Sequence, residues 1–154
     1  MADAAEILTR RYSLVATNVP FLGWREMSAD LANWVAEHHQ PTRGDLGYTV
    51  WRRALRLLEV GGTVSAVSLQ HWLSLTSYKR FRAELLSEET LASVAHLGSG
   101  AFQEISGQKV NVTLTISSRS TPDETTQTLL LDASSPISPS LKEEALGNSA
   151  ILLT

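Results

Sequence analysis

Residues 12–21 read YSLVATNVPF, and this stretch decides the fold of the 154-residue chain. Its first six residues are short, apolar or β-branched, a pattern typical of a buried strand. Pro20 ends the strand because proline has no N–H to donate to a sheet ladder. Asn18 therefore lies where a buried strand becomes a loop. In open α/β sheets, ligands bind at this edge, outside the carboxyl ends of the strands.

The chain that follows alternates between helix and strand patterns. Ser28 is a suitable N-cap for a helix over 29–39, and Asp45 for a longer one whose C-terminus meets Gly61 at the C′ position. Alternation of this kind predicts an α/β fold with a mainly parallel sheet covered on both faces, in which the last two long strands could be antiparallel. The remaining expected elements are strands over 63–69, 91–97, 110–117 and 128–133, a helix over 77–86, a linker over 134–140 and a short helix within 141–154.

Composition sets limits on the function. Hydrophobic residues make up 43% and charged residues 19%, as in soluble globular domains, and no apolar run is long enough to span a membrane, so we expect a cytoplasmic protein. Zero cysteines exclude thiolate zinc sites, and the four histidines lack zinc-ligand spacing, so no metal site is expected. The net charge of −3 argues against a stand-alone nucleic-acid binder. Two basic stretches are interpreted as solvated helix faces: Arg52, Arg53 and Arg56, and Lys79, Arg80 and Arg82.

Two interpretations of Asn18 are open from the residues alone. The amide can form an Asx turn that ends the strand. Alternatively, its oxygen and a carbonyl in the following loop can each accept a hydrogen bond from one exocyclic amino group. Phe21 can then stack on the base that carries this group. Such positioning leaves the nitrogen lone pair free to attack a methyl group without a strong general base.

Three blocks of the chain resemble a known family. Residues 12–23 (YSLVATNVPFLG), 43–86 and 94–116 (VAHLGSGAFQEISGQKVNVTLTI) are similar, in this order, to successive segments of amino-methyltransferases with an Asn-Pro-Pro-Tyr/Phe motif. The resemblance is greatest to the adenine-specific DNA methyltransferases of restriction-modification and BREX-type phage-defence systems. It implies a Rossmann-like class I methyltransferase sheet in a three-layer α/β/α arrangement.

The resemblance implies that S-adenosyl-L-methionine is the methyl donor and a flipped DNA adenine the acceptor. By this resemblance Asn18 and the Val19 carbonyl bind the amine, with Pro20 shaping the turn and Phe21 stacking on the base. Phe102 would pack on the other side of the base, although an aromatic residue in a glycine-rich loop can also fill the core. Asp45 and Leu46 fall where the family lines its pocket near the cofactor.

The sequence departs from the family in two ways. Val19 replaces the first proline of the motif, which keeps the carbonyl but loses the restricted φ. Only eleven residues precede Tyr12, so we expect residues 1–118 to be the C-terminal half of a catalytic domain, and residues 119–154 a linker with a short strand and helix. Such a chain would need a cofactor-binding half and a target-recognition domain from elsewhere. The alternatives are an inactive remnant or interaction module, and a methyltransferase acting on protein glutamine or RNA adenine.

Overall fold

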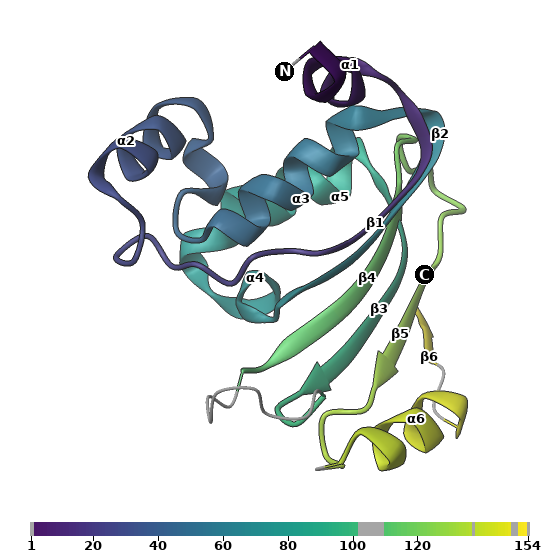
Figure 1. The fold of residues 1–154 in the computed structure, drawn as a ribbon. Coiled ribbons are helices and arrows are strands. Elements are labelled where there is room, and N and C mark those ends of the chain that lie inside the picture. The colour runs from purple at the N-terminus through teal and green to yellow at the C-terminus, as the bar shows by residue number, and fades with distance from the viewer. Residues whose placement is uncertain (1, 102–109, 137, 149–150, 154) are drawn as a thin grey trace.

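The strand predicted after Arg11 forms, and it is the edge of a six-stranded sheet in the computed structural model of the chain, which describes residues 2–101, 110–136, 138–148 and 151–153 (Figure 1). The helices are α1 (Ala2–Thr9), α2 (Ala29–His38), α3 (Leu46–Leu57), α4 (His71–Ser74), α5 (Lys79–Glu88) and α6 (Pro139–Asn148). The strands are β1 (Tyr12–Asn18), β2 (Leu58–Leu69), β3 (Thr90–Gly98), β4 (Val112–Ser118), β5 (Thr128–Asp132) and β6 (Ile151–Leu153).

The sheet has the order β1-β2-β4-β3-β5-β6. Strands β1 and β2 pair in parallel, as do β3 and β5, whereas β4 is antiparallel to both of its neighbours and β6 is antiparallel to β5. Strands β1, β2, β3 and β5 therefore point the same way, and their carboxyl ends share one edge. The α/β class and the antiparallel arrangement of β3 and β4 are as predicted, whereas the sheet is mixed rather than mainly parallel, with three of its five strand pairs antiparallel.

The core lies between the sheet and the helices α3, α4 and α5, which share one face of it (Figure 1). Val15 pairs with Val64, and both point into this core. Strand alternation places Leu14 and Ile116 on the opposite face, where they are 62% and 36% exposed. At these strands the described residues supply the sheet and one helical layer, and no helix covers the second face, so the three-layer arrangement expected from the sequence is not found there.

One strand boundary was predicted wrongly. Gly61 was expected to end a helix, but α3 ends at Leu57 and β2 begins immediately, with Leu58 opposite Tyr12. Gly61 has the positive φ (80°) expected of such a glycine, yet it lies within the strand. Its N–H donates to the Arg119 carbonyl at 2.9 Å, so a partner 58 residues away in the sequence, rather than the local pattern, determines its place.

Smaller differences concern the two ends and one connection. The helix α1 and the short helix α4 were not predicted, and a 3-10 turn at Thr76–Tyr78 precedes α5. The expected linker is partly helical, because α6 already begins at Pro139, and the tail adds β6 besides the expected helix. Strand β5 pairs with β3, so the segment after residue 118 continues the same sheet. None of the helices in the described ranges is long and apolar enough to cross a bilayer.

Candidate functional site

Asn18 is the last residue of β1, at the edge where four strands end. Its side chain is exposed and makes no hydrogen bond to any described residue, so its amide can meet a ligand. The next residue, Val19, is buried (3% exposed), and its N–H continues the ladder by donating to the Val67 carbonyl at 3.2 Å. The Val19 carbonyl accepts no hydrogen bond from the described residues. Two acceptors thus stand next to each other at the start of the loop.

The loop after Asn18 is held by the segment that starts α3. The Leu46 N–H donates to the Leu22 carbonyl at 2.9 Å, and the Trp24 N–H donates to the Gly44 carbonyl at 3.1 Å. A Cβ on Gly47 would lie 2.8 Å from the Pro20 carbonyl oxygen, closer than real Cβ contacts. A side chain at position 47 would therefore push the loop away, and the glycine lets the helix start lie directly against it.

Asp45 lies beside this loop in a structural role. Its Oδ1 accepts a hydrogen bond from the Gly47 N–H at 2.8 Å, which caps α3 as predicted. The side chain is 5% exposed, and this burial raises the pKa of its carboxyl group. Leu46, the other residue expected near the cofactor, is partly buried.

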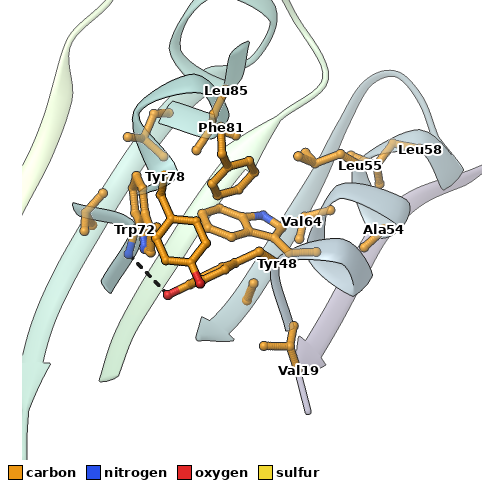
Figure 2. Packing of buried hydrophobic residues seen from close by; sticks show 14 residues of the cluster. Val19, Tyr48, Ala54, Leu55, Leu58, Val64, Trp72, Tyr78, Phe81 and Leu85 are labelled. Carbon is orange, nitrogen blue, oxygen red and sulfur yellow. Dashed lines mark hydrogen bonds between the residues drawn. The ribbon is translucent and has the colours of Figure 1, made fainter. Parts of the chain in front are cut away.

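A cluster of aromatic side chains in the core is hydrogen-bonded to the carboxyl edge of the sheet. The Tyr48 hydroxyl donates to the Leu69 carbonyl at 3.0 Å and accepts from the Trp72 N–H at 3.2 Å, which joins α3 to the end of β2 and the start of α4 (Figure 2). The Tyr48 and Tyr78 rings meet edge to face at 4.6 Å. Burial raises the pKa of Tyr48 far above its usual value and that of Tyr78 to about 12, so both hydroxyls stay protonated. Phe21 is half-buried and packs against the hydrophobic core to which these rings belong.

A second polar group at the same edge was missed from the sequence. His96 lies between Gln70, which contacts its Nε2, and Asp132, whose Oδ1 is 3.5 Å from its Nδ1. Nearby, Lys142 is 3% exposed, and its Nζ donates to the carbonyls of Leu97 at 2.6 Å, Ala133 at 2.9 Å and Ser134 at 3.4 Å. Burial lowers the pKa of Lys142. These residues lie far apart in the sequence, so no local sequence pattern predicts that they meet.

The expected site residues are thus brought together in part. Asn18, Val19, Pro20 and Phe21 form one turn, and Asp45 and Leu46 lie against it. Phe102 lies outside the described residues, so its expected contact with a base stays a prediction. In the described ranges, no three histidine or carboxylate side chains gather as metal ligands would.

The position expected for S-adenosyl-L-methionine, at Asp45 and Leu46, does not coincide with the main cavities of the described residues. Two cavities, of about 690 and 310 Å³, are lined by other residues and contain neither Asp45 nor Leu46. The Asp45 carboxylate is already occupied as a helix cap.

Two curated proteins are similar in sequence to about 70% of this chain. The adenine-specific methyltransferase BrxX of Escherichia coli O9:H4 (strain HS) is 36% identical over 109 residues, which are 71% of this chain and 9% of BrxX. The adenine-specific methyltransferase PglX of Lacticaseibacillus casei (strain Zhang) is 31% identical over 106 residues, which are 69% of this chain and 9% of PglX. No family model matches the sequence. The expected resemblance to adenine-specific methyltransferases is confirmed.

Solved structures confirm the fold class. A protein from Vibrio vulnificus YJ016, described as the modification subunit of a type I restriction enzyme, superposes with a TM-score of 0.66 at 17% identity, over 93% of this chain and 34% of that one. A protein from Listeria monocytogenes, described as a class I S-adenosylmethionine-dependent methyltransferase, gives 0.61 at 14% identity, over 90% of this chain and 42% of that one. The chain therefore has the fold of part of a class I methyltransferase sheet, and it spans 9% of the length of each curated relative.

Proposed function

We propose that this chain, which is related to a segment of the adenine-specific methyltransferases BrxX and PglX, carries the target-base part of a DNA adenine-N6 methyltransferase. The observation that carries the proposal is the pair of adjacent acceptors at the end of β1, the exposed Asn18 amide and the Val19 carbonyl. An exocyclic amine has two hydrogens, and two acceptors from one turn can take both of them.

The surroundings of the turn suit this role. Hydrogen bonds from Trp24 and Leu46 hold the loop, and the close approach of Gly47 fixes its distance from α3. Acceptors that are already in place need no reorganisation when a base arrives, which is the main way such a site lowers a barrier. Phe21 offers the exposed part of its ring to the base. Base flipping costs a few kcal/mol, and stacking on this ring and on Phe102 offsets part of that cost.

Val19 stands where the family has its first proline, and its contacts suit a turn that is held in a different way rather than a turn that is lost. A proline at position 19 would have no N–H, whereas the Val19 N–H donates to the Val67 carbonyl at 3.2 Å. The ladder hydrogen bond can thus fix the backbone that the ring of a proline would otherwise restrict. The carbonyl of residue 19, which is the expected acceptor, is the same group with either residue.

We infer that a cofactor-binding part completes the site along β1. Strand β1 pairs only with β2 among the described residues, so its other edge offers unpaired backbone groups, and the exposed Leu14 lies beside that edge. A neighbouring strand and helix would cover both. The methyl donor, S-adenosyl-L-methionine, and a target-recognition domain for DNA would come with the rest of the protein.

A chimaera tests the base-binding role. This chain replaces the matched segment of the Escherichia coli BrxX, and N6-methyladenine in DNA is measured. We expect Asn18→Ala to lower methylation by at least about 100-fold, as the loss of one preorganised hydrogen-bonding group does. The matched control is Asn33→Ala, an exposed asparagine on α2. Equal methylation by the Asn18→Ala and Asn33→Ala chimaeras would refute the role of Asn18.

The same chimaera separates the alternatives. A folded chimaera that binds S-adenosyl-L-methionine and DNA but methylates nothing would identify the chain as an inactive remnant or interaction module. Methylation of RNA or of a protein glutamine in place of DNA would identify the other enzymes. Calorimetric titration of the chain alone with S-adenosyl-L-methionine is expected to show no binding, and micromolar binding would overturn the inference that a cofactor half is needed.

A further inference from the structure

The larger of the two cavities described above lies at the opposite end of the sheet from Asn18. It has a volume of about 690 Å³, within the range of ligand pockets. It opens where β1, β2 and β3 begin and β4 ends, so the length of β1 separates it from Asn18 by about 20 Å. A ligand in this cavity cannot be the target base of the proposed reaction.

Arginine dominates the lining of this cavity, which we call the arginine cavity. Five arginines line it against two glutamates, Glu88 and Glu89, so these seven side chains carry a net charge of +3 when all are ionised, in a chain whose net charge is −3. The arginines are Arg10, Arg11, Arg53, Arg56 and Arg119. They come from three separate parts of the chain, and a cleft in which one sign of charge predominates concentrates the field within it.

Neutral groups hold several of these arginines in place. Arg53 donates to the Leu8 carbonyl at 3.1 Å, Arg119 donates to the Leu58 carbonyl at 2.5 Å, and Arg11 donates to the Arg56 carbonyl. A carbonyl orients a guanidinium without cancelling its charge, and each guanidinium has five N–H donors. Most donors of these three arginines thus remain available for an anion.

Arg10 forms an ion pair with Glu6, and the two glutamates of the cavity compensate the other four arginines only in part. Glu88 already accepts a hydrogen bond from Arg52, outside the cavity, at 3.1 Å. Burial raises the pKa of Glu89, and its Oε2 has no hydrogen-bond partner among the described residues. Arg56 makes no side-chain hydrogen bond to a described residue, and its charge is the most available.

We propose that the arginine cavity binds an oligophosphate, either the phosphate chain of a nucleotide or the backbone of a single-stranded nucleic acid. A guanidinium group can form two parallel hydrogen bonds with the oxygens of one phosphate group. A chain of phosphates can form such pairs with several arginines, whereas a single carboxylate can form only one. Arginines that converge from several directions suit a ligand with more than one phosphate group. Phosphate binding in this cavity does not depend on the proposed methyl transfer, because it involves neither Asn18 nor a target base.

Titration of the full chain with inorganic triphosphate tests the proposal. We expect binding, and we expect Arg53→Gln combined with Arg56→Gln to weaken it by at least about tenfold, because charge-assisted hydrogen bonds are lost. The matched control, Arg43→Gln with Lys79→Gln, removes the same charge from exposed positions outside the cavity. Arg53 also contacts Leu8, so Arg56→Gln alone is the second variant, with the circular dichroism spectrum as the check of folding.

Two further probes identify the source of the phosphates. ATP that binds more tightly than inorganic triphosphate indicates a nucleotide. A thymine-only oligonucleotide indicates a nucleic-acid backbone if its affinity falls with salt and if the double variant lowers the slope of log affinity against log salt by about 1.4. Absence of triphosphate binding, equal loss in the control, or equal binding of polyglutamate would overturn the proposal. The Asn18→Ala variant should bind all these probes unchanged.

Discussion

The Tyr48 hydroxyl provides a test of how the carboxyl edge of the sheet is held together. It joins three elements, because it donates to Leu69 at the end of β2 and accepts from Trp72 at the start of α4. Tyr48→Phe removes one oxygen and leaves the ring in place. The Trp72 N–H is then buried without a partner, which costs about 1–3 kcal/mol, and the partly buried Leu69 carbonyl loses a weaker bond. We expect a loss of about 2–3 kcal/mol in the free energy of unfolding.

Urea unfolding followed by circular dichroism measures this loss. The midpoint should fall while the slope m stays constant, because the surface exposed on unfolding is unchanged. In thermal unfolding the same loss corresponds to a decrease of about 4–12 °C in Tm. Tyr78→Phe is the matched control, since its ring lies 4.6 Å from that of Tyr48, and its hydroxyl makes no hydrogen bond to a described residue.

The two variants delete the same atom from neighbouring rings of one cluster, so their difference isolates the hydrogen bonds. We expect Tyr78→Phe to change the free energy of unfolding by less than about 0.5 kcal/mol. Equal losses in the two variants, or a Tyr48→Phe protein as stable as the unchanged chain, would refute the view that this hydroxyl stabilises the edge.

Two other predictions concern the turn at Asn18. Gly47→Ala should destabilise the chain by about 1–3 kcal/mol, because its Cβ would meet the Pro20 carbonyl, whereas Gly147→Ala, with open space around it in α6, should change stability by no more than about 1 kcal/mol and in the opposite direction. Urea unfolding of both decides this. The raised pKa of Asp45 means that the folded state holds its proton more tightly, so this group's contribution to stability is lost as pH rises from the unfolded pKa through the folded one. Asp45→Asn keeps an N-cap and should gain stability relative to the unchanged chain as the pH rises above about 4, the ordinary pKa of an aspartate, and a difference that does not change with pH would contradict this.

Local signals predicted much of the fold. Ser28 and Asp45 cap α2 and α3 as expected, because a cap is a contact between residues two or three positions apart. The strand at Tyr12 was also predicted from its composition, but it was expected to be buried, and none of its residues is buried in the described structure, where β1 is an edge strand. The start of β2 was missed because Gly61 pairs with Arg119, and nothing near Gly61 in the sequence reports that partner.

The same distinction holds for the sites. The turn at Asn18 is contiguous, so it could be recognised as a motif. His96, Gln70 and Asp132 come from three strand ends, and their meeting depends on the strand order. Arg53 and Arg56 were interpreted as part of a solvated helix face. Only the fold shows that they share a cavity with Arg119, which directly follows β4.

The place of β4 has a consequence for the time course of folding. This strand pairs with β2 on one side and β3 on the other, although both are synthesised before it. A chain emerging from the ribosome therefore cannot close the middle of its sheet until Ser118 has been released, and until then β2 and β3 each have an unsatisfied edge. We expect β4 insertion to be the late, slow step of folding, because its pairing with β2 joins residues up to 55 positions apart, as Thr63 with Ser118. Nascent chains arrested before residue 112 should be the ones that chaperones and proteases engage.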